Sequence, residues 1–133
     1  MQIIASKLSY LQAHDALTIL HHSLSLPSML HILRTAECVN HPLLYAFDEH
    51  LHQCLSGILN FSLDDKSWKQ ASLPVKAGGL GIRSIVQVAP SAFLAYHAAT
   101  RSLVRTILSH RLQDMVDQGL QEVLNIWHGL GGM

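Results

Sequence analysis

The chain has 133 residues, of which 49% are hydrophobic and 14% are charged, and its 9 basic residues balance its 9 acidic residues. This length fits one compact domain, and the composition excludes a disordered tail, a collagen-like chain and a disulfide scaffold. No apolar run approaches the roughly 18 residues of a transmembrane helix, and the start lacks the order of a signal peptide. We therefore expect a single intracellular domain over residues 1–133 with no membrane partner.

The first 60 residues show helical periodicity. Apolar residues recur at steps of three and four from Leu8 to Leu24, which predicts a helix over 15–24 that begins at Asp15, and Pro27 opens a further segment. The clearest pattern is the apolar stripe from residue 43 to residue 59. It follows Asn40 or His41 as the cap, with Pro42 in the first turn.

Residues 60–83 interrupt this periodicity. The acidic end of Ser62–Asp65 predicts a cap that leads into a short turn around Trp68, and Pro74 favours extended backbone before it. Three glycines in residues 78–81 allow positive φ angles. We expect an irregular connector near residues 66–83, either a loop or a hairpin, packed on the helices.

The remaining residues predict two more helical regions. Ser84 caps a short stretch, and Pro90 either kinks it or opens the main helix, which runs to about Ser109. A last helix covers roughly residues 112–128 and ends at a group of glycines. The fold class is therefore all-α, with about five or six helices in a small bundle.

Basic residues are concentrated in one part of the chain. Residues 66–113 contain no acidic residue and seven basic ones, namely Lys66, Lys69, Lys76, Arg83, Arg101, Arg105 and Arg111. In the fold this stretch either pairs with the acidic residues elsewhere in the chain or presents a basic surface to a polyanion.

The patterns of known catalytic and metal sites are missing. The ten histidines show no pair at helical ligand spacing with a carboxylate partner, so we expect no metal site. The glycine cluster matches neither a dinucleotide fingerprint nor a Walker loop, and Asp64 with Asp65 fits a helix cap better than a catalytic metal pair. We predict no catalytic residue and no cofactor. Backbone amides of the glycine turn, flanked by Lys76 and Arg83, remain candidates for contact with a phosphate.

The segment WKQASLPVKAGGLGIRS, from Trp68 to Ser84, resembles a segment of non-LTR retrotransposon reverse transcriptases that lies downstream of the polymerase palm. The resemblance extends over roughly residues 8–108 and includes the stretch from Ala89 to Ala95. Its motif residues are Trp68, Gln70, Pro74, Gly78, Gly79 and Gly81. Tyr96 and His97 depart from the family pattern, in which small residues usually follow.

The resemblance implies a helical thumb and connector that grips the template–primer. The aromatic-x-Asp-Asp motif of the palm, which binds catalytic Mg²⁺ in these enzymes, has no counterpart in this sequence. We therefore expect a truncated, non-catalytic fragment that is inactive alone as an RNA-directed DNA polymerase. Trp68 is expected to be a structural anchor, and the candidate contacts to the nucleic-acid backbone are Lys69, Lys76, Arg83, Arg101 and Arg105.

A second hypothesis comes from a different functional class. A thumb without its palm exposes the apolar face that packs against the palm, and such a face favours self-association. The chain is then a helical protein-interaction module that forms homo-oligomers and does not bind nucleic acid.

Overall fold

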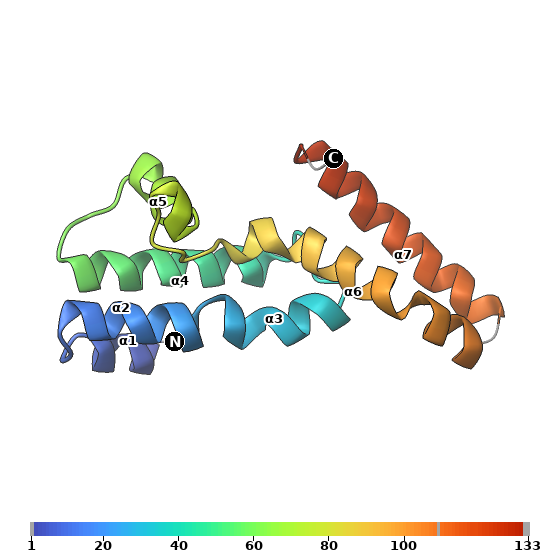
Figure 1. The fold of residues 1–133 in the computed structure, drawn as a ribbon, viewed down its shortest axis with the longest axis horizontal. Helices are drawn as coiled ribbons and strands as arrows, with labels where there is room; N and C mark the ends of the chain where they lie inside the picture. Colours follow the sequence, from blue (N-terminus) through green and yellow to red (C-terminus); the bar gives the residue numbers. More distant parts are fainter. Residues whose placement is uncertain (1, 109, 132–133) are drawn as a thin grey trace. The chain divides into compact units, whose positions relative to one another are not determined.

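A computed structural model describes residues 2–108 and 110–131, and the side chains of residues 3–108, 114 and 116–131. The all-α class is confirmed, because helices and turns make up these residues and no strand occurs among them (Figure 1). The chain divides into two compact units: the first unit is Met1–Met29 with Asn40–Val86, and the second unit is Leu30–Val39 with Gln87–Met133. The single domain over residues 1–133 stays a prediction.

The first unit is organised around α4 (Pro42–Leu59), against which α1 (Gln2–Leu8) and α2 (Ala13–Ile19) pack. Helix α4 begins where the sequence predicts, because His41 Nδ1 accepts a hydrogen bond from Leu43 N at 3.2 Å and Pro42 occupies the first turn. It ends at Asn60, which adopts the left-handed conformation with φ 56°. The buried core of this unit includes Leu8, Ala16, Leu20, Leu44, Leu51, Leu55, Leu63, Ala71, Ile82 and Ile85.

The helix predicted over 15–24 differs from the structure at both ends. Helix α2 begins at Ala13, and Asp15 lies inside its first turn instead of capping it. A π-helical turn, Leu20–Leu24, then replaces regular helix. Ser25 N donates to Leu20 O at 3.0 Å, and the buried Ser25 hydroxyl donates to His21 O at 3.1 Å. Helix α3 (Leu26–Thr35) follows and has residues in both units.

The predicted connector contains a helix. Residues Asp65–Ala71 form α5, because Asp64 Oδ1 accepts a hydrogen bond from Ser67 N at 2.9 Å and caps the first turn. The 3₁₀ turn η2 (Val75–Ala77) and an irregular segment up to Ser84 follow. Of the two expected forms, the irregular loop is therefore found and the hairpin is not, since residues 60–84 contain no strand.

Helix α6 (Ile85–Ile107) continues through the buried Pro90, so this proline does not begin a new helix. Its later turns expose Leu103 and Ile107, at 60% and 70% of their surface. Helix α7 (His110–Gly129) starts two residues earlier than predicted and ends at a glycine. The described residues form no helix that is long and apolar enough to span a membrane.

Candidate nucleic-acid interface

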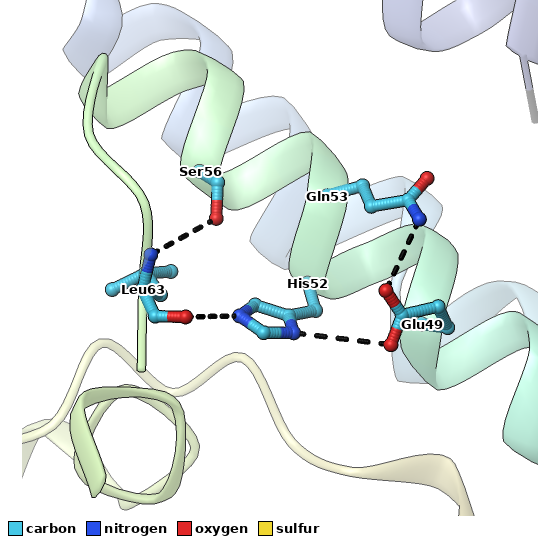
Figure 2. A network of polar contacts seen from close by, with 5 residues as sticks. All are labelled: Glu49, His52, Gln53, Ser56 and Leu63. Atoms are coloured by element: carbon cyan, nitrogen blue, oxygen red, sulfur yellow. Dashed lines mark hydrogen bonds and ion pairs between the residues drawn. The ribbon is translucent and has the colours of Figure 1, made fainter. Parts of the chain in front are cut away.

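Helix α5 carries Trp68 and is attached to α4 through the ring of His52. The two rings stack with their centroids 5.1 Å apart and their planes inclined by 24°. Figure 2 shows His52 between two acceptors, with Nε2 at 3.0 Å from Leu63 O and Nδ1 at 4.0 Å from a Glu49 carboxylate oxygen. These contacts give Trp68 a packing role and hold the chain that enters α5.

Of the acidic pair, Asp64 caps α5 and Asp65 is the first residue of this helix. Hydrogen bonds from the Ser67 side chain and amide hold the pKa of the exposed Asp64 carboxyl below its usual value. Asp65 lies in the first helical turn, where a negative charge is favourable. Within the described residues, no group of three or more His, Cys, Asp or Glu side chains is arranged to hold a metal ion.

The glycine turn after α5 folds back on the end of that helix. Gly78 and Gly81 have φ angles of 83° and 72°, in the left-handed region that glycine adopts without strain. A Cβ atom at Gly79 would lie 2.0 Å from Leu73 O and 2.7 Å from Gln70 O. Only glycine permits this approach of two backbone segments, which explains the motif position physically.

The amides of this turn are already used within the turn. Gly78 N donates to Val75 O at 3.1 Å, and Gly79 N donates to Pro74 O at 3.1 Å. Leu80 N and Gly81 N donate to Ala71 O and Leu73 O, at 3.0 and 2.9 Å. The expectation that these amides contact a phosphate is therefore wrong, because neighbouring carbonyl groups satisfy them. A phosphate at this turn would therefore be contacted by the Lys76 and Arg83 side chains and not by the backbone amides.

The candidate basic residues are all exposed, but they lie on both units. Lys69 on α5, Lys76 in η2 and Arg83 before α6 belong to the first unit, whereas Arg101 and Arg105 lie one turn apart on α6 in the second unit. Among the described residues, no carboxylate oxygen comes within 4.0 Å of the charged groups of Lys66, Lys69, Lys76, Arg83 and Arg101. Direct ion pairing therefore does not neutralise these five side chains.

Sequence reasoning missed the connection between Asp48 of α4 and the start of α6. The Asp48 carboxylate accepts hydrogen bonds from the Ser84 hydroxyl, from Ile85 N at 2.7 Å and from Val86 N at 3.5 Å. The sequence predicts a cap at Ser84, and the structure adds the Asp48 carboxylate to it. The acceptor lies 36 residues away in the chain, so no local pattern identifies it. Arg83 directly precedes Ser84 in the chain.

Comparison with known proteins gives no relative for this chain. No family model, curated protein or solved structure matches it.

Proposed function

We propose that this chain is a non-catalytic, thumb-like region of the non-LTR reverse transcriptase type that binds the nucleic-acid backbone without reading base sequence. The motif between Trp68 and Ser84 carries the family proposal. In such a role the parent enzyme's palm would bind Mg²⁺ and perform the chemistry, while this region would contact phosphates.

The observation that carries the binding proposal is the exposure of the basic side chains. Lys69, Lys76, Arg83 and Arg101 are exposed, and none of them has a carboxylate partner within 4.0 Å among the described residues. Flexible exposed cations neutralise phosphates and release condensed counterions, which favours binding independently of base sequence. This surface chemistry fits a nucleic-acid backbone better than a neutral partner.

The test is the salt dependence of binding to fluorescently labelled single-stranded and duplex oligonucleotides, measured by anisotropy. We expect the logarithm of the binding constant to fall linearly with the logarithm of the salt concentration. Replacing Arg101 and Arg105 together by glutamine should reduce the magnitude of the slope by about 2 if each contacts one phosphate. Duplex oligonucleotides of different sequence and equal length, whose bases are paired, should bind alike.

The matched control is Lys7→Gln, which removes an exposed cation from α1, outside the basic stretch. This variant should keep the wild-type slope. Binding that does not depend on salt, or an equal loss of slope in the control, would contradict the proposal.

Self-association is a second candidate function, favoured by the exposed apolar residues on α6. Leu103 and Ile107 are 60% and 70% exposed and lie four residues apart, so they share one side of the helix. Light scattering after size exclusion at several concentrations tests this function. A concentration-dependent dimer that Leu103→Gln with Ile107→Gln abolishes, together with no oligonucleotide binding, would favour it over the first proposal.

A further inference from the structure

The second unit contains a cavity of about 320 Å³ between the loop after α3, helix α6 and helix α7. Its walls include apolar side chains, Phe93 and Val116, and two titratable ones, Glu37 and His97. A volume near 300 Å³ lies at the lower end of the range for small-molecule sites, which combine apolar walls with a few polar groups. This cavity therefore suits a ligand of the size of a single nucleoside.

The exposed Glu37 carboxylate lies against α7 at one side of the cavity, in space left by the absent side chain of Gly119. A Cβ atom at Gly119 would lie 2.7 Å from Glu37 Oε2, so alanine at this position would displace the carboxylate. Gly119 lies in the middle of α7, where glycine is less favourable than alanine. Glu37 offers the ligand a hydrogen-bond acceptor with a negative charge.

His97 supplies the second polar group. Its Nε2 atom is buried and has no hydrogen-bond partner among the described residues, although such an atom normally has one. Burial lowers the pKa of His97, while the Glu37 carboxylate acts in the opposite direction. The ring is therefore neutral at pH 7 and offers one donor and one acceptor. It contacts the Phe93 ring, with centroids 4.2 Å apart, and the residue lines the cavity.

A cation lies beside this cavity on the same helix. Arg101 is one turn after His97 on α6 and lines an adjoining hollow that shares His97 and Val116 with the cavity. A ligand that fills the cavity and extends along α6 thus reaches a guanidinium group. Asp117 also lines the adjoining hollow and reduces the positive potential there.

We propose that this cavity binds cytosine or adenine, the nucleobases with an amino group at C4 or C6, and that this amino group donates a hydrogen bond to the Glu37 carboxylate. Carboxylates accept from the amino group of cytosine, whereas the carbonyl group of uracil at the same position is repelled. Phe93 and Val116 contact the base, and Arg101 contacts the phosphate of the same nucleotide. This inference rests on the proposed function and adds to it a preference for unpaired bases that carry an amino group.

The experiment is a titration of the ¹⁵N-labelled full chain with cytidine and with uridine, followed by amide shifts. These nucleosides differ only at C4 and N3: cytidine has an amino group and an unprotonated N3, whereas uridine has a carbonyl group and an N3–H. We expect cytidine to shift amides in residues 93–101 and 116–120 and to bind about tenfold more tightly than uridine, as one specific hydrogen-bonding contact allows. No shifts with either nucleoside up to millimolar concentrations, or equal affinities, would overturn the proposal.

Two variants locate the preference at Glu37. Glu37→Gln should lose the cytidine preference, because an amide accepts from the amino group and also donates to the uracil carbonyl. The matched control, Glu122→Gln, makes the same change at an exposed position of α7 and should keep the preference. Preserved selectivity in Glu37→Gln would reject the site. Gly119→Ala, which displaces the carboxylate, should also weaken cytidine binding.

Nucleosides have no phosphate. The nucleoside titration therefore tests the cavity, whereas the salt dependence of oligonucleotide binding tests the contacts with the nucleic-acid backbone. Absence of a cytidine preference leaves backbone binding standing. Absence of salt-dependent oligonucleotide binding with an intact cytidine preference rejects the thumb-like function and not the cavity.

Discussion

Gly79 brings the turn after α5 closer to that helix than a side chain permits. A Cβ atom there would overlap the backbone carbonyl group of Leu73, with 2.0 Å to its oxygen and 2.5 Å to its carbon. Gly79→Ala must therefore move backbone atoms, and we expect the free energy of unfolding to fall by at least about 2 kcal/mol. Urea unfolding followed by far-UV circular dichroism measures this change.

Gly57 provides the matched control, because a Cβ atom there meets no atom within 4 Å and the residue lies in α4. Gly57→Ala should raise the free energy of unfolding by about 0.5–1 kcal/mol, since alanine has less backbone freedom to lose in a helix. Equal effects of the two substitutions would show that the close packing at Gly79 does not contribute to stability.

At the scale of single residues, the sequence predicts the backbone conformation of a residue better than it predicts which other residues that residue contacts. Positive φ angles at Gly78 and Gly81 follow from the glycine cluster itself. The use of their amides does not follow, because the accepting carbonyl groups of Val75 and Leu73 become neighbours only when the turn closes. The approach of Glu37 to Gly119 is hidden for the same reason, since it joins segments about 80 residues apart.

A single carboxylate of α4 caps the start of α6, whose first two residues, Ile85 and Val86, belong to the first unit. Asp48 on α4 accepts from the Ile85 and Val86 amides, which are among the amides at the start of α6 that lack an intrahelical partner. Its negative charge also interacts favourably with the positive end of the helix dipole. Asp48 therefore links the register of α4 to the start of α6.

Asp48→Ala should lower the free energy of unfolding by about 2 kcal/mol, because it removes charge-assisted hydrogen bonds and a helix cap. Asp48→Asn keeps an acceptor and loses the charge, so we expect a smaller loss. The control Glu122→Gln changes an exposed carboxylate of α7 and should alter stability by less than about 0.5 kcal/mol. Chemical denaturation at pH 7 compares the three variants; a loss in Asp48→Ala no greater than in the control would refute the cap.

Helices are predicted more accurately when the residues that define them are close together in the sequence. Helix α4 combines an apolar stripe, a cap at His41 and a proline in the first turn, and its bounds agree with the prediction. Helix α5 is short, so its periodicity is weak, and its attachment depends on the stacking of Trp68 on the distant His52. The π-helical turn after α2 ends at Ser25, whose burial and hydrogen bond to Leu20 O no sequence pattern indicates.

On the scale of the whole chain, the charge asymmetry of the sequence is redistributed by the fold. The boundary between the units falls after Val86, inside the acid-free stretch of residues 66–113. The first unit contains five basic and five acidic residues, and the second contains four of each. Each unit is formally neutral, so attraction to a polyanion arises from the local placement of exposed cations and not from net charge.

This distribution predicts how the two units share backbone binding. Replacing Lys76 and Arg83 by glutamine removes two exposed cations from the first unit, and replacing Arg101 and Arg105 removes two from the second. If both units contact phosphates of one oligonucleotide, each pair should reduce the magnitude of the salt slope by about 2, and the fourfold variant should reduce it by about 4. If only one pair changes the slope, the interface lies on that unit alone. A fourfold variant with the wild-type slope would show that these side chains do not contact the nucleic acid, because only cations that contact phosphate release counterions and contribute to the slope.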